Sequence, residues 1–138
     1  MMFERIEKNG ILYAEVIWKD FSPEKTRFMS SPERSFQFGV VAHEAGYEEP
    51  PHDHKKIERV ISDLQQAIFV ISGKLLIRFF IEETGEEFEN VTLGPGDAIC
   101  LVHGPHSIST LERVKCLSVK QGPFRGDEND KIILNNVR

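Results

Sequence analysis

The sequence has little cysteine, and what it has is poorly placed for disulfide or thiolate chemistry. Only two cysteines occur among the 138 residues, Cys100 in "DAICLV" and Cys116 in "RVKCLSV". Both stand in apolar runs, and neither has a second cysteine at Cys-x-x-Cys spacing. We therefore expect two buried, reduced thiols and no activated cysteine nucleophile.

The chain also lacks an excess of positive charge and a long apolar run. Its net charge is −5 and its pI is about 5.5, so no basic patch is available to bind nucleic acid. No apolar run approaches the roughly 18 residues of a membrane span. The first residues, "MMFERIEKNG", are charged at once and do not resemble a signal peptide. We expect a cytoplasmic protein that binds neither nucleic acid nor a membrane.

Helical periodicity is almost missing, and short apolar runs separated by turn residues take its place. The length allows one domain with a real core, and 40% hydrophobic and 28% charged residues are ordinary for a soluble globular protein. We divide this single domain into an N-terminal strand and connection (1–35), a barrel core (36–120) and a C-terminal tail (121–138). Residues 19–35, with two prolines and many charges, are expected to be an irregular surface connection.

The apolar runs are rich in Val, Ile, Phe and Leu, which favour strands. Turn residues such as "SG", "ETG", "GPGD" and "HGP" separate several of them. Strands are predicted at 11–18, 36–43, 57–61, 66–72, 74–81, 87–92, 98–102, 106–111 and 114–120. This number of short strands predicts an all-β sandwich or small barrel.

A histidine pair suggests a metal site. In "PPHDH", His52 and His54 are two residues apart, and in a strand their side chains would share one face. Two imidazoles on one face can bind one transition metal. His106 opens another predicted strand, after the turn-rich stretch "LGPGDAICLVHGP". A surface location for each histidine is the alternative.

These motifs resemble the cupin superfamily over residues 46 to about 111. "PPHDH" matches its histidine pair, "QAIFVISG" matches the segment from its fourth ligand to a glycine, and "GPGDAICLVHGPH" matches its second motif. The resemblance implies a double-stranded β-helix, a jelly-roll barrel with a metal in its mouth. Two features depart from the family pattern: the gap between His54 and Gln66 is longer, and Val102 stands where a proline is usual.

The fourth ligand is either Gln66 or Glu58. Gln66 has the expected spacing to Gly73, whereas Glu58 has the short spacing to His54 but no glycine where one should follow. We favour His52, His54, Gln66 and His106. Three imidazoles and an amide carry no negative charge, so the charge of a divalent ion would not be compensated. Such a ligand set favours zinc, nickel, iron or copper over hard metals. A glutamine also cannot act as a general base.

The resemblance implies a small metal-binding cupin whose pocket takes a small polar or carbohydrate-like ligand, as an isomerase or an oxygenase. Arg59 and Arg78 could hold an anionic or polyhydroxy ligand at the barrel mouth. Two alternatives stay open: a non-catalytic ligand-binding or sensor cupin, and a metal-free sugar-nucleotide epimerase or ketoisomerase. We also expect a homodimer in which the predicted strand 11–18 covers an edge of the partner.

Overall fold

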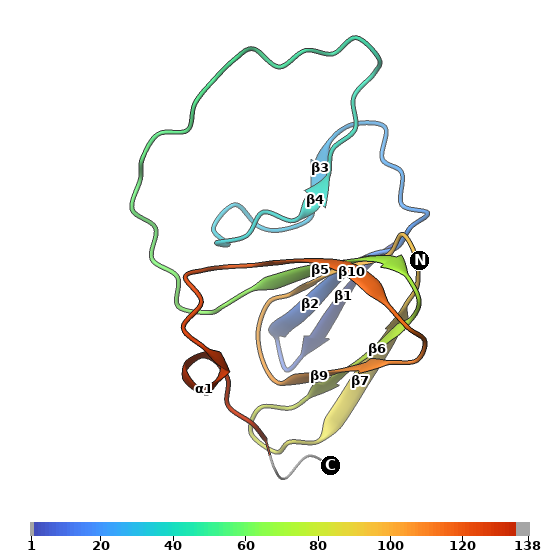
Figure 1. The fold of residues 1–138 in the computed structure, drawn as a ribbon, viewed down its shortest axis with the longest axis vertical. Helices are drawn as coiled ribbons and strands as arrows, with labels where there is room; N and C mark the ends of the chain where they lie inside the picture. Colours follow the sequence, from blue (N-terminus) through green and yellow to red (C-terminus); the bar gives the residue numbers. More distant parts are fainter. Residues whose placement is uncertain (1, 135–138) are drawn as a thin grey trace.

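A computed structural model describes residues 2–134 and shows an all-β protein built from antiparallel strands (Figure 1). One short helix, α1 (Asp127–Asp130), lies in the tail. The strands are β1 (Phe3–Lys8), β2 (Ile11–Ile17), β3 (Arg27–Phe28), β4 (Gly39–Val40), β5 (Gln66–Ser72), β6 (Leu75–Phe80), β7 (Glu87–Leu93), β8 (Ala98–Leu101), β9 (His106–Thr110) and β10 (Lys115–Lys120).

Two sheets face each other across the core. The larger has the strand order β1-β2-β8-β5-β10, and the smaller has the order β7-β6-β9. A separate pair, β3 and β4, lies outside both sheets (Figure 1). The alternation of buried and exposed side chains along a strand shows which face of the sheet contacts the core. In β5, Ile68 and Val70 are buried, whereas Phe69 and Ile71 are exposed on the outer face. The buried apolar cluster comprises Ile6, Tyr13, Ala14, Val16, Ile68, Val70, Leu75, Ile77, Phe79, Val91, Leu93, Ile99 and Leu101.

The tight turn between β5 and β6 depends on one glycine. Gly73 has a φ of +83°, and a Cβ atom added there would lie 2.0 Å from the carbonyl oxygen of Arg113. Only glycine fits both the backbone conformation and the close approach. This turn brings β6 back antiparallel to β5, so that the two sheets are connected at one end.

Several predicted strands need correction. Residues 57–61 form no strand and are exposed, and of the predicted strand 36–43 only Gly39–Val40 is paired. The connection 19–35, expected to be irregular, contains β3. Strand β1 was not predicted, because its sequence "FERIEK" is mostly charged. It forms at the edge of the larger sheet, where one face is exposed and only Ile6 must be buried.

The position of β2 also corrects the expected dimer contact. Strand β2 is paired with β1 on one side and with β8 on the other. Its backbone groups are therefore already bonded within the sheet, and it cannot cover an edge of a partner.

Between β4 and β5 the chain leaves the body of the molecule and returns (Figure 1). Residues 43–64, which we name the projecting segment, have no helix or strand, and all of them are exposed. The tail, residues 121–134, runs from β10 along the surface and includes α1. Within residues 2–134 no helix has the length and apolar character that crossing a membrane requires.

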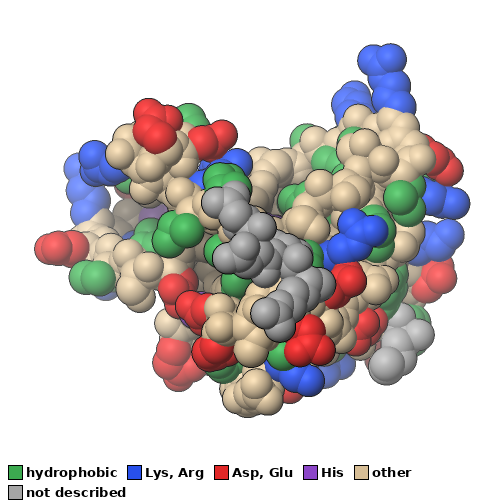
Figure 2. Space-filling view, turned by 90° about the horizontal axis from the view of Figure 1, so that it is seen from below, with side chains coloured by type: hydrophobic (Ala, Val, Ile, Leu, Met, Phe, Trp, Pro, Cys, Tyr) green, Lys and Arg blue, Asp and Glu red, His purple; other side chains and the backbone are tan. Residues whose placement is uncertain are grey.

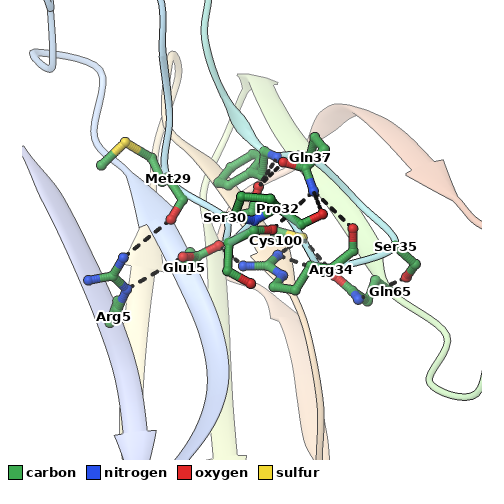
Figure 3. Close-up of polar contacts among 12 residues, drawn as sticks. Arg5, Glu15, Met29, Ser30, Pro32, Arg34, Ser35, Gln37, Gln65 and Cys100 are labelled. Carbon is green, nitrogen blue, oxygen red and sulfur yellow. Dashed lines mark hydrogen bonds and ion pairs between the residues drawn. The ribbon is translucent and has the colours of Figure 1, made fainter.

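A buried polar cluster fastens the segment after β3 to the outer face of the larger sheet (Figure 3). Glu15 of β2 is only 1% exposed and forms an ion pair with Arg34. The Nη2 atom of Arg34 donates to Oε1 of Gln65 at 3.2 Å. Gln65 in turn donates through Nε2 to Oγ of Ser35 at 3.1 Å. Buried polar atoms require such partners, so this cluster has a structural role.

Candidate functional site

Two of the four expected metal ligands lie on the inner faces of the two facing sheets, where both side chains keep contact with solvent, His106 more than Gln66. Gln66 pairs with Leu101, which is buried, and stands two residues before buried Ile68. His106 pairs with Phe79, which is 1% exposed. Residues paired across antiparallel strands point to the same face, so both side chains lie on inner faces.

Gln66 and His106 also lie at the same end of the two facing sheets. Strand β6 turns back on β5, and β9 runs antiparallel to β6, so β5 and β9 point in the same direction (Figure 1). Each residue is the first of its strand. The end of the two sheets at which β5 and β9 begin is therefore the place where a ligand could meet both residues; we name this end the barrel mouth.

The hydrogen bonds of Gln66 suit its expected role. Its Nε2 atom donates to Oγ of Ser118 on β10 at 2.8 Å. The amide nitrogen is thereby engaged, and the carbonyl oxygen is the atom that can bind an ion. An amide whose nitrogen is held in this way keeps one orientation, which is what a ligand needs.

The ring of His106 is held in one tautomer. Its Nδ1 atom lies 3.3 Å from the carbonyl oxygen of Gly104, and since a carbonyl only accepts, we assign the proton to Nδ1. The lone pair is then on Nε2. Burial by the atoms around the ring lowers the pKa of His106 below its usual value, the hydrogen bond to Gly104 opposes this, and the charge of Lys131 lowers it further. A neutral imidazole is the form that binds metals.

His52 and His54 lie in the projecting segment, away from the core. Their ring centroids are 5.3 Å apart, and the rings are nearly perpendicular. Nδ1 of His52 is 3.0 Å from the carbonyl oxygen of Pro50, and Nε2 is 3.5 Å from a carboxylate oxygen of Glu49. The sequence motif thus does bring the two imidazoles together, but on exposed chain rather than on a strand.

The structure does not assemble the histidines into one site. Within residues 2–134, no group of three or more His, Cys, Asp or Glu side chains is arranged to hold a metal ion. Gln66 and His106 belong to the two facing sheets, whereas His52 and His54 belong to the projecting segment. A site made of all four would require that segment to approach the barrel mouth.

The other candidate residues do not lie on the inner faces of the two sheets. Glu58 and Arg59 are exposed in the projecting segment, where Arg59 donates to the carbonyl oxygen of Ile57 at 3.4 Å. Arg78 alternates with buried Ile77 and Phe79, so it points to the outer face of the smaller sheet, where its Nε atom is 3.3 Å from Glu87. This outward position corrects the expectation that Arg78 faces the mouth.

His103 was not among the predicted site residues, yet it contacts two carboxylates. Its Nε2 atom is 3.1 Å from Glu82, and its Nδ1 atom is 3.4 Å from Asp63 at the end of the projecting segment. Burial acts to lower the pKa of His103, but the bonds to Glu82 and Asp63 outweigh it and raise the pKa above its usual value. Because its partners are distant in sequence, only the "HGP" turn signalled it.

A hollow of about 340 Å³ lies away from the barrel mouth. It lies on the outer face of the larger sheet and is mostly apolar, lined among others by Trp18, Phe21, Phe38, Val41, Phe69 and Ala98. It contains no histidine and no carboxylate, so it does not serve the expected metal chemistry.

The chain was compared with known proteins by sequence and by fold. No family model, no curated protein and no solved structure matches it. Its function must therefore be argued from the arrangement of its own residues.

Proposed function

We propose that this protein is a small jelly-roll barrel of the cupin type that binds a divalent transition metal and, beside it, a small polar ligand at the barrel mouth. The observation that supports this most is the position of Gln66 and His106. They lie on facing inner surfaces, at the same end, with the amide oxygen of one and the Nε2 lone pair of the other available. The strand pairings β5–β8, β5–β10, β6–β7 and β6–β9 are compatible with a jelly roll.

In the proposed site, His52 and His54 complete the ligand set when the projecting segment closes on the mouth. The segment is joined to the body at β4 and at β5, where His43 contacts Thr26 and Asp63 pairs with His103, so the closure bends the chain between these two points. Binding an ion supplies the free energy for such a closure, because ligands gathered around a metal are ordered by it. The metal would supply Lewis acidity and a fixed point of attachment for the ligand's oxygen atoms.

Three neutral imidazoles and an amide place zinc, nickel, iron or copper ahead of magnesium or calcium. The same set contains no carboxylate that could act as a general base. The proposed activity is therefore binding of a polar or carbohydrate-like ligand through the metal, and an isomerase or oxygenase reaction is an extension that requires observed turnover.

The experiment is metal analysis of protein purified without a histidine tag, followed by calorimetric titration with zinc and with nickel. We expect one ion per chain, and its loss in His106→Ala. His103→Ala is the matched control, because His103 is a neighbouring histidine that is paired with two carboxylates outside the proposed site. Metal binding that is equal in both variants and in the unchanged protein would refute the proposed ligand set.

A further inference from the structure

Strand β1 forms one edge of the larger sheet, and among residues 2–134 its backbone pairs with β2 alone. The N–H and C=O groups on its other side are therefore open to a further strand. The irregularity in this pairing belongs to β2, because the single step from Ile6 to Glu7 corresponds to two steps in β2, from Ala14 to Leu12. Strand β1 itself runs over six residues without a bulge or a proline, the usual devices that block an edge.

The side chains of β1 alternate between the two faces of the sheet. Ile6 is 2% exposed and packs in the core, so Glu4 and Lys8, two residues before and two after it, lie on the same inner face. Arg5 and Glu7 lie on the outer face. On each face the two charges thus have opposite signs, one on either side of Ile6, and the order of the signs is reversed between the faces.

This order of charges is complementary to itself in one antiparallel register. When Ile6 stands opposite Ile6 of a second copy, Glu4 stands opposite Lys8, and Arg5 stands opposite Glu7. Directly opposed residues share a face, so every such pair joins charges of opposite sign on the same side of the sheet. A slip of two residues in either direction would place Arg5 opposite Arg5 or Glu7 opposite Glu7. The charges therefore select a single register.

Three of these four charged side chains lack an ion-pair partner in the chain. Among residues 2–134, no ion pair is formed by Glu4, Glu7 or Lys8. Arg5 is the exception, because its Nε atom is 3.5 Å from Oε2 of Glu15, yet its side chain is 51% exposed and keeps donors for a second carboxylate. A second copy in the register described would give each of the four a partner.

The overall charge of the chain does not attract a second copy. Its net charge of −5 opposes association at long range. On the face shown in Figure 2, acidic and basic side chains are interspersed and do not form large areas of one sign. Attraction between two copies therefore has to come from particular residues placed opposite each other, as along β1.

We propose that β1 binds β1 of a second copy of this chain, antiparallel and about a twofold axis at Ile6, so that two five-stranded sheets become one continuous sheet. The pairing adds about four to six backbone hydrogen bonds and covers an open edge. The ion pairs are partly exposed, so each contributes little to affinity, and their main effect is to fix the register. This dimer is independent of the proposed metal site, because it uses neither Gln66 nor His106 nor the projecting segment.

The first test is the mass of the full chain in solution, by sedimentation over about 5–500 μM, because a short strand pairing gives a weak dimer. Glu4→Lys places a lysine opposite Lys8 in both halves of the dimer, so the dissociation constant should rise about tenfold. Lys115→Glu is the matched control, because it reverses an exposed charge on β10, the opposite edge of the same sheet. A monomer throughout this range, or a dimer that Glu4→Lys does not weaken, would overturn the proposal.

Charge exchange tests which residues face each other. Glu4→Lys and Lys8→Glu chains should each dimerise poorly alone, but a mixture of the two should form a mixed dimer in which both pairs have opposite signs. Both substitutions in one chain should restore most of the affinity. If neither combination recovers any affinity, positions 4 and 8 do not face each other and the proposed register is wrong. Circular dichroism checks folding, since Nζ of Lys8 also lies 5.9 Å from the ring centroid of Phe88.

Cross-linking tests the same register without relying on charge. In a Cys116→Ser background, where the remaining Cys100 is buried, Glu4→Cys and Lys8→Cys chains are oxidised separately and as a mixture. Only the mixture should give disulfide-linked dimers. Positions 4 and 8 stand directly opposite, within the Cα separation of about 4.4–6.8 Å that a disulfide spans, whereas position 4 of one copy is about 14 Å from position 4 of the other. Linked dimers of Glu4→Cys chains alone, or none in the mixture, would refute the proposed pairing.

Discussion

Arg34, which follows β3, forms an ion pair with Glu15, which lies in the middle of β2. Glu15 is 1% exposed and the Arg34 side chain 13%, so the pair is removed from solvent. Arg5 approaches the same carboxylate, with its Nε atom 3.5 Å from Oε2. The ion pair fixes an otherwise irregular segment to the sheet. The fold therefore depends on Arg34, a residue that lies outside the strands.

Arg34→Ala should therefore strongly destabilise the protein. It leaves the Glu15 carboxylate buried with only the half-exposed Arg5 as a partner, and a buried charge without its partner costs about 3–5 kcal/mol. Urea denaturation measures the free energy of unfolding. The double variant Glu15→Gln/Arg34→Met, which removes both charges, should lose less. Equal losses in the two variants would mean that the uncompensated charge is not the cause.

Substitution at the fourth ligand position should change metal affinity in a defined direction. Gln66→Glu adds a negative charge beside the proposed ion, so zinc affinity should rise by about tenfold or more. Glu58→Gln should leave it unchanged, because the proposed ligand set contains Gln66 and not Glu58. Calorimetric titration of both variants compares them. Unchanged affinity in the first together with loss in the second would make Glu58 the ligand.

His103 should make stability depend on pH. Its pKa in the folded protein is raised above the usual 6.5 by Glu82 and Asp63, despite the opposing effect of burial. When the pKa of a group is higher in the folded protein than in the unfolded chain, its protonation stabilises the folded state. This stabilisation is complete below the pKa of the unfolded chain and is lost as the pH rises through the pKa of the folded protein. The unchanged protein should thus lose stability relative to His103→Asn between about pH 6 and pH 9. Urea denaturation of both proteins at each end of this pH range measures the difference in their free energies of unfolding. A difference that does not change with pH would contradict the prediction.

The two cysteines should react differently with thiol reagents. Burial raises the pKa of Cys100 to about 11, with the positive charge of Arg34 acting in the opposite direction. Cys116 is only partly buried, although burial raises its pKa as well. In native protein at about pH 8, Cys116 should react slowly and Cys100 should not react until the protein unfolds. Mass spectrometry of partially labelled protein identifies which thiol has reacted, and early labelling of Cys100 would disprove this.

The local pattern of the sequence was sufficient to predict the positions of the strands from β5 to β10. The apolar runs that begin at 66, 74, 87, 98, 106 and 114 each form a strand within a residue or so of the predicted limits. Turns at "SG" and "GPGD" separate them, and the glycines at 73 and 96 adopt the positive φ that such turns require. The all-β class followed from these runs, because strand composition and turn chemistry are local properties.

Only the tertiary structure decides which strand each strand pairs with and which residue each buried polar side chain contacts. "IERVI" has the composition of a strand, but residues 57–61 have no neighbouring strand to bond with and stay exposed, whereas the charged "FERIEK" becomes β1 because β2 is beside it. Glu15 can be buried because Arg34, nineteen residues later, folds over it. Gln66 and His106 face one interior because two sheets meet there, while His52 and His54, two residues apart, remain in the projecting segment. Hydrogen bonds between strands and pairing of buried charges join residues far apart in the chain, and no local pattern contains that information.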